Sequence, residues 1–318
     1  MKKQKFILTI LLIAILISSV VSLAAAQDKK LYIPVISKGF QHQFWLAVRA
    51  GAEQAAKDFD VTITFEGPES ESQVDKQMDM LQVAIDKNPA AICFAAVDSK
   101  AAIPLLEQAK EKGIPIIGFD SGVDSDIPLT TASTDNIAAA ALAADKMAEL
   151  IGGAGEVAII AHDQTSRTGI DRVKGFTDRI TEKYPNITIV ATQYGGGDHL
   201  KSTDLAKAII QGNPELKGFF GANEGSIIGV MNAVQEFGIK GQLVIIGYDS
   251  GQQQIEAIRS GLLAGAITQD PIGIGYKCVE AAIKAVKGET LPKFIDTGFH
   301  WYDSTNIDDP MIAALLYK

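Results

Sequence analysis

Residues 91–120 have the sequence AICFAAVDSKAAIPLLEQAKEKGIPIIGFD, in which two short apolar runs enclose a longer segment of mixed character. The runs at 91–95 and 114–119 are short and apolar, which predicts buried strands. Between them, the segment near Ser99 to Lys112 repeats its apolar residues every three or four positions, and this predicts a helix. A strand, a helix and a strand in this order predict one βαβ unit of a parallel sheet.

The same alternation extends in both directions from this unit. Further apolar runs at 31–36, 61–65, 156–160, 187–193, 217–221, 243–247 and 264–268 predict strands, and helical segments lie between them. Apolar strands joined by long helices are typical of parallel sheets covered on both faces, the doubly wound α/β class. Roughly ten strands exceed one comfortable open sheet, so we expect two lobes.

The first residues have the pattern of a secretory signal peptide. Three lysines within the first five residues precede an apolar run from Phe6 to Val21, and three alanines end at Ala26. This predicts cleavage after Ala26, and hence export to the periplasm or the extracellular space. A membrane anchor is the alternative, but the run is short for a hydrocarbon core of ~30 Å.

The charge balance bears on the choice of partner. The formal net charge of the 318 residues is -9, and removing the three N-terminal lysines changes -9 to -12. Binding to nucleic acid or to anionic membranes requires clustered Lys and Arg, and the sequence has no such cluster. The composition therefore disfavours both as partners.

Cysteine and histidine usage gives no sign of a metal or another cofactor. The only cysteines, Cys93 and Cys278, lie in apolar stretches. We interpret them as buried thiols, with a disulfide as the alternative. The four histidines lie far apart in the sequence without Cys or carboxylate at ligand spacing, so no metal site is predicted.

Polar and aromatic side chains follow the predicted strands, at the edge where open parallel sheets bind their ligands. Hydroxyl groups both donate and accept, so carboxylates, amides and guanidinium groups suit a neutral polyol, while aromatic rings can cover the C–H face of a sugar. Side chains of these kinds at the predicted edge include Lys38, Gln41, Phe44, Trp45, Asp120, Ser121, Arg167, Arg172, Asn223, Asp249 and Gln269.

Each of these residues also has a structural interpretation. The two aromatics would belong to the core. Asp120 and Asp249 would tighten strand-to-helix turns. Arg172 would be a solvated charge on a helix. Their recurrence at one edge of the predicted sheets favours a shared site.

At these residues the sequence resembles the ribose- and galactose-type periplasmic binding proteins, the type I pentose and hexose binders of ABC importers. The resemblance runs from about Leu31 to Gly288. It is carried by Phe44-Trp45 before Gly51-Ala52, Ile114-Pro115-Ile116-Ile117 leading to Asp120, Arg172 before Gly175-Phe176, Asn223-Glu224, Gly247-Tyr248-Asp249 and Ala266-Ile267-Thr268-Gln269.

The resemblance implies ligand-binding roles for Phe44, Trp45, Asp120, Arg172, Asn223, Asp249 and Gln269, and Lys38, Gln41, Ser121 and Arg167 are additional candidates. It also implies a soluble monomer that clamps one sugar or polyol between two lobes and presents it to an ABC permease with its ATPase. It also implies three chain crossings between lobes. The expected parts are a signal peptide at 1–26, an N-terminal lobe at 27–133 plus 270–295, and a C-terminal lobe at 134–269 plus 296–318. Ala95, Gln41 and residues 195–198 depart from the ribose-binding pattern, so the identity of the sugar does not transfer.

Three other classes of function share features with this sequence. A receptor that presents a sugar or a furanosyl autoinducer to a chemotaxis or sensor protein would use the same clamp, so this alternative stays open. Sugar-responsive repressors share the two-lobed core, but they carry an N-terminal helix-turn-helix where this chain has its signal peptide. An enzyme is not expected, because the sequence has no G-x-G-x-x-G after the first strand, no P-loop and no G-x-S-x-G elbow.

Overall fold

The computed structural model describes residues 30–317, and from Tyr32 on the chain forms one compact unit. The predicted signal peptide lies outside the described residues. Within residues 30–317, the search for a helix long and apolar enough to cross a membrane finds none.

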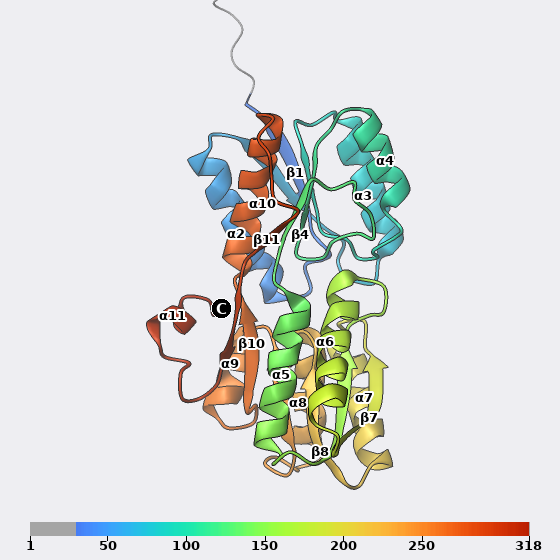
Figure 1. Ribbon diagram of the computed structural model, residues 1–318, viewed down its shortest axis with the longest axis vertical. Coiled ribbons are helices and arrows are strands. Elements are labelled where there is room, and N and C mark those ends of the chain that lie inside the picture. The colour runs from blue at the N-terminus through green and yellow to red at the C-terminus, as the bar shows by residue number, and fades with distance from the viewer. Residues whose placement is uncertain (1–29, 318) are drawn as a thin grey trace, which may run out of the picture. The chain divides into compact units, whose positions relative to one another are not determined.

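A first six-stranded sheet is built from the N-terminal part of the chain and one late strand (Figure 1). Its order is β11-β5-β4-β3-β1-β2, and every neighbouring pair is parallel. The strands are β1 (Tyr32–Ile36), β2 (Thr62–Glu66), β3 (Ile92–Phe94), β4 (Ile116–Phe119), β5 (Thr130–Ser133) and β11 (Phe294–Asp296). The predicted βαβ unit at 91–120 is therefore confirmed as β3, α4 and β4.

Two pairs of helices cover this sheet. Helices α2 (Gln43–Asp58) and α10 (Pro271–Val286) share one apolar core with β1, β3 and β4, and α3 (Val74–Asp86) and α4 (Ile103–Glu111) share another. Glycines let α2 and α10 cross closely, because a Cβ on Gly51 would lie 1.9 Å from the carbonyl oxygen of Ile272. This crossing fixes the start of α2, where the two predicted aromatics lie.

The second sheet repeats this order with later segments, as β12-β10-β9-β8-β6-β7. Its strands are β6 (Gly155–Ala161), β7 (Ile187–Tyr194), β8 (Leu216–Gly221), β9 (Val244–Tyr248), β10 (Gly265–Gln269) and β12 (Phe299–Tyr302). Helices α5 (Asn136–Leu150) and α6 (Arg167–Lys183) pack on one face; α7 (His199–Gly212), α8 (Glu224–Glu236) and α9 (Gln252–Arg259) pack on the other. A short helix, α11 (Pro310–Ala313), lies in the tail.

The sequence reading missed β5, β11 and β12 because none of them is a continuous apolar run. β5 has the sequence TTAS, and the residues of β11 are exposed or half-buried. β12 also pairs antiparallel with β10, so the second sheet is not purely parallel. β11 and β12 lie at the edges of their sheets, where one side can meet solvent and less apolar sequence is needed. β5 is mostly buried between β11 and β4, but its polar sequence gives no apolar signal for a strand.

The chain passes between the two sheets three times, after β5, after β10 and after β11. The expected boundaries 133/134 and 269/270 coincide with the ends of β5 and β10, whereas 295/296 lies inside β11; the division of the chain into lobes at these residues stays a prediction. The tail has contacts with both halves: Ile307 and Ile312 join the core of the second sheet, whereas Tyr317 joins the core of the first. We call the half around each sheet a lobe from here on.

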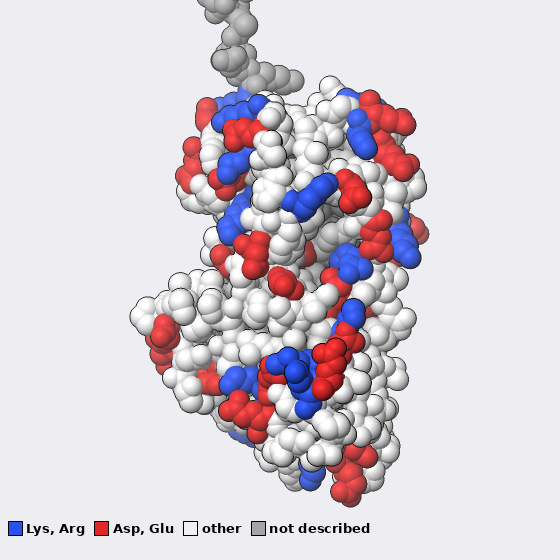
Figure 2. Space-filling model, in the orientation of Figure 1, with Lys and Arg blue, Asp and Glu red and all other residues white. Residues whose placement is uncertain are grey.

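The two cysteines meet inside the first lobe. Cys93 of β3 and Cys278 of α10 are free, fully buried thiols in the same core cluster. Burial raises the pKa of Cys278, and the hydrogen bond with Cys93 raises it further. On the molecular face seen in Figure 2, acidic and basic side chains are interspersed rather than gathered into one basic patch.

Candidate functional site

Two aspartates occupy matching positions in the two lobes. Asp120 follows β4 and Asp249 follows β9, and these strands hold the same place in the two sheet orders. Both residues have positive φ, 53° and 80°, which is uncommon for a residue with a side chain but tolerated by aspartate. Their backbone N–H groups bond the next strand, at Ala132 (2.9 Å) and Ile267 (2.7 Å). Backbone strain of this kind clusters at ligand sites.

The carboxylates of this pair differ in what they bind. Asp249 accepts from Gln269 Nε2 at 2.7 Å and from the backbone N–H of Glu224 at 2.9 Å. No hydrogen bond from residues 30–317 reaches the carboxylate of Asp120, although the residue is buried. Burial raises the pKa of Asp120 to about 7, against the lowering effect of Lys38 and Arg172.

Arg172 of α6 is buried and held on three sides. Its Nε donates to Asn136 Oδ1 at 2.7 Å, its Nη1 donates to the carbonyl of Ala222 at 2.9 Å, and its guanidinium lies 3.7 Å from the ring centroid of Tyr248. The interpretation as a solvated helix charge is therefore wrong. Fixed in this way, the guanidinium lies beside Asp249, whose carboxylate oxygen Oδ2 is 4.0 Å from Nη1.

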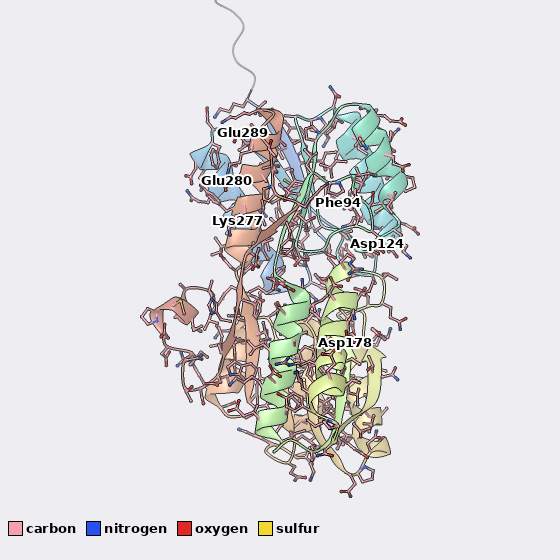
Figure 3. All side chains as sticks on the ribbon, viewed as in Figure 1. Phe94, Asp124, Asp178, Lys277, Glu280 and Glu289 are labelled. Carbon is pink, nitrogen blue, oxygen red and sulfur yellow. The ribbon has the colours of Figure 1, made fainter. Side chains whose placement is uncertain are left out.

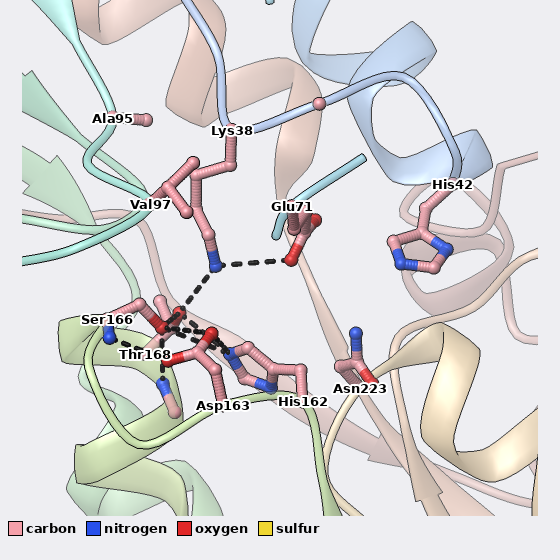
Figure 4. A network of polar contacts seen from close by, with 12 residues as sticks. Lys38, His42, Glu71, Ala95, Val97, His162, Asp163, Ser166, Thr168 and Asn223 are labelled. Carbon is pink, nitrogen blue, oxygen red and sulfur yellow. Dashed lines mark hydrogen bonds and ion pairs between the residues drawn. The ribbon is translucent and has the colours of Figure 1, made fainter. Parts of the chain in front are cut away.

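A buried carboxylate organises the opposite wall. Glu71, in the segment between β2 and α3, accepts from Trp45 Nε1 at 2.7 Å and lies 3.2 Å from Lys38 Nζ. Lys38 also donates to Thr168 Oγ1 of the second lobe at 3.2 Å (Figure 4). Burial alone would raise the pKa of Glu71, but the charge of Lys38 and the hydrogen bond from Trp45 hold it below its usual range. Glu71 thus orients the indole of Trp45 by a hydrogen bond and links it to the ammonium of Lys38.

The start of α2 is completed by the other lobe. The N-cap residue, His42, makes no side-chain cap, so the first N–H groups of the helix need another acceptor. Glu224 of α8 supplies it, accepting from the backbone N–H of Gln43 (3.1 Å) and Phe44 (3.3 Å). A carboxylate at a helix N-terminus also meets the positive end of the helix dipole. This contact joins the lobes directly beside the two aromatics.

Further contacts join the lobes at the outer side of the site. The backbone N–H of Ser99 donates to the carbonyl of Thr165 at 2.9 Å, and Arg167 pairs with Asp124 at 3.4 Å. Figure 3 labels Asp124 close to where the lobes meet. With the contacts of Lys38 and Glu224, they hold the lobes together around the space between them.

That space is a pocket bordered by strand ends of both lobes. The structure places all seven principal candidates at it. Lys38 joins them, along with four residues that the sequence reading did not select. The lining residues are Lys38, His42, Phe44, Trp45, Glu71, Asp120, His162, Thr168, Arg172, Asn223, Asp249 and Gln269.

Three of the additional candidates are not part of this lining. Arg167 is 36% exposed at its side chain and pairs with Asp124 and Asp171 on the surface. The side-chain Oε1 of Gln41 accepts a hydrogen bond from the backbone N–H of Glu71 at 3.3 Å, so Gln41 helps to hold Glu71 in place. Ser121 is buried, and its hydroxyl has no hydrogen-bond partner within residues 30–317.

The two pocket histidines are neutral at pH 7. Burial lowers the pKa of His162 to about 3 and also lowers that of His42. A neutral imidazole offers one donor and one acceptor, which suits hydroxyl groups. Gln269 adds a buried Oε1 that no group in the described part of the chain satisfies, and such atoms are usually paired in a functional complex.

The missed residues follow the same rule as the predicted ones. His162 comes directly after β6, and Glu71 lies in the segment after β2, so both stand at carboxyl ends of strands. Glu71 was missed because the run EGPESES at the end of β2 looks like an ordinary polar loop, although it also follows the carboxyl end of a strand. Within residues 30–317, no group of three or more His, Cys, Asp or Glu is placed to hold a metal ion.

The two lobes have the same architecture and enclose a pocket lined by hydrogen-bonding groups. This arrangement defines a two-lobed α/β binding protein. The chain belongs to the periplasmic binding protein domain family, whose model matches residues 33–290, and it is a type I periplasmic sugar-binding protein.

Its relatives have corresponding descriptions. It is 28% identical to the D-allose-binding periplasmic protein of Escherichia coli, over 81% of this chain and 86% of that protein. An ABC transporter solute-binding protein from Agrobacterium vitis with bound D-fucose is 34% identical, with a TM-score of 0.87, over 90% of this chain and 100% of that one. A chain from Brachyspira murdochii described as an ABC transporter, LacI family transcriptional regulator, is 40% identical, with a TM-score of 0.79, over 92% and 100%. The sugar-binding relatives are binding and transport proteins rather than enzymes.

Proposed function

We propose that this protein is an exported, monomeric solute receptor that closes on one monosaccharide or related polyol and delivers it to an ABC importer. The observation that carries the proposal is the pocket itself. It joins two adjoining aromatic rings to carboxylate, guanidinium and amide groups from two lobes. Relatives that bind D-allose and D-fucose support the ligand class.

The residues divide the work by chemistry. Phe44 and Trp45 meet at right angles, with an interplanar angle of 83° and centroids 5.0 Å apart, so together they form a corner against which an apolar ring face packs. Asp120 and Asp249 accept from hydroxyl groups, while Arg172 donates to them. Asn223 and Gln269 supply amides that can do either.

Closure follows from contacts that only the closed arrangement can make. Lys38 reaches Thr168, and Glu224 reaches the first turn of α2, across the space that the ligand fills. A ligand that touches both lobes adds contacts to this arrangement alone and therefore shifts the population toward it. The permease would then bind the closed form.

A thermal-shift screen followed by calorimetry tests the proposal. The panel is D-allose, D-ribose, D-arabinose, D-fucose, D-tagatose and simple polyols, with furanosyl signalling compounds as a separate arm. A true ligand at one hundred times its Kd stabilises the folded protein by ~2.7 kcal/mol, so Tm should rise with concentration. Response to furanosyl signals alone would favour the receptor alternative. No response to any sugar or polyol would contradict the proposed function.

A further inference from the structure

Glu71 makes two contacts with ligand-facing groups at once. One carboxylate oxygen accepts the indole N–H of Trp45 at 2.7 Å, and the other lies 3.2 Å from the ammonium of Lys38. All three side chains are buried, at 7%, 1% and 2% exposure. Burying a carboxylate raises the free energy of the folded protein unless it has fixed hydrogen-bond donors and a nearby opposite charge. Here Trp45 is the donor and Lys38 is the opposite charge.

Within residues 30–317, Glu71 is the carboxylate that pairs directly with the ammonium of Lys38, while Asp163 and Asp120 act on its charge from farther away. An ammonium has three N–H donors, and the described contacts of Lys38 Nζ are with Glu71 and Thr168. An uncompensated buried ammonium attracts carboxylates strongly, because the local dielectric is low. The charged side chains that line the pocket are two cations, Lys38 and Arg172, and three carboxylates, Glu71, Asp120 and Asp249. The lining therefore disfavours an anionic ligand.

We propose that Glu71 is the positioning residue that sets the ligand class: it orients the ring of Trp45 as a wall and neutralises Lys38, so that the pocket takes a neutral sugar rather than an acidic one. This rests on the proposed function. Glu71 acts through Trp45 and Lys38, and its removal changes what those two groups present to a ligand.

Glu71→Gln separates the two effects. The amide keeps the size of the side chain and an oxygen that can accept the indole N–H, but it removes the negative charge beside Lys38. The exposed pair of Glu53 with Arg49, at 2.7 Å, offers a matched control, since Glu53→Gln changes the net charge equally but far from the pocket. Lys38→Met with Glu71→Gln removes both buried charges together.

The measurement is calorimetric affinity for two matched pairs, D-galactose with D-galacturonate and D-glucose with D-glucuronate, and for D-allose, D-ribose and D-fucose. Glu71→Gln should raise the affinity for a uronate relative to neutral sugars at least tenfold. The Glu53→Gln control should keep the wild-type ratio, and the double variant should lose the gain. An unchanged ratio in a folded Glu71→Gln variant would overturn the inference. If Glu71→Gln fails to fold, the double variant decides. It lacks the ammonium of Lys38, so any uronate binding by it would also contradict the inference.

A ligand-free readout keeps this test distinct from that of the proposed function. In a Trp301→Phe background, Glu71→Ala should alter the emission and near-UV circular dichroism of Trp45, and Glu71→Gln should restore them. If the wild type binds no neutral sugar, the proposed function fails. In that case the inference about Glu71 is overturned if two results occur together. Glu71→Ala leaves the Trp45 spectra unaltered, and Glu71→Gln gains no uronate binding.

Discussion

Replacing Asp120 with Asn should change ligand affinity and ligand-free stability in opposite directions. The substitution is close to isosteric, and Asn also tolerates the positive φ of 53° at this position. No hydrogen bond within residues 30–317 uses the carboxylate, so the change breaks no described contact of the side chain. Asp249 is a less clean target, because both of its oxygens accept bonds from the protein.

The loss of affinity follows from the hydrogen bonds that the carboxylate would accept from ligand hydroxyls. A bond to a charged group is worth ~1.5–3 kcal/mol. At ~1.4 kcal/mol per factor of ten, the Kd should rise roughly 10- to 150-fold. The measurement is calorimetric titration with whichever sugar the screen identifies.

The gain in stability follows from the buried charge. Burial raises the pKa of Asp120 from an ordinary 3.8 to about 7, with Lys38 and Arg172 acting in the opposite direction. A carboxyl group with a raised folded pKa favours folding most below its unfolded pKa, and that contribution is lost as pH rises through about 7. At pH 8 the ligand-free Asn variant should therefore be more stable than wild type by a few kcal/mol, or several degrees in Tm at ~2–4 °C per kcal/mol. At pH 5 the difference should shrink.

Affinity should show the complementary pH dependence. Hydroxyl groups that donate to the carboxylate lower its pKa in the complex, so wild-type affinity should rise as the pH rises toward the free-protein value near 7. The part of this dependence that comes from Asp120 should vanish in the Asn variant, even though burial also raises the pKa of nearby Glu224 to about 7. Wild-type affinity combined with a lowered Tm at pH 8 would refute the reasoning.

Three further outcomes are expected. Glu224→Ala removes the acceptor of two N–H groups at the start of α2, a loss comparable to that of an N-cap at ~1 kcal/mol. Small-angle scattering should therefore show a larger ligand-free radius, and calorimetry about fivefold weaker binding. An unchanged scattering curve would count against a role of the Glu224 contact in holding the lobes together. Trp45→Phe should abolish the fluorescence response to ligand while Trp301→Phe preserves it, and the reverse pattern would exclude stacking on Trp45. Gly51→Ala should lower Tm, because the new Cβ would lie 1.9 Å from a carbonyl oxygen of α10 and overpacking costs ~1–3 kcal/mol. Gly212→Ala is the control: it has open space around it and should be neutral or slightly stabilising.

The order of strands and helices was readable from the chain because apolar runs and helical periodicity are local properties. They gave β1, β3 and β4 and the helices between them, and the rule that parallel strands bind ligands at their carboxyl ends led to Asp120, Arg172 and Asp249. Strands without apolar sequence, such as β5 and β11, were missed, because their pairing depends on neighbours that are distant in the chain.

The sequence by itself determined the fold class and the principal candidates, since each depends on residues a few positions apart. Only the tertiary structure decided how those candidates are held. Glu71 is one carboxylate in a polar loop until folding brings it to Trp45 and Lys38, and Glu224 caps a helix that begins 181 residues before it. Hydrogen bonds and buried charges act over a few ångströms in space, and separation along the chain does not reveal which groups will meet at that distance.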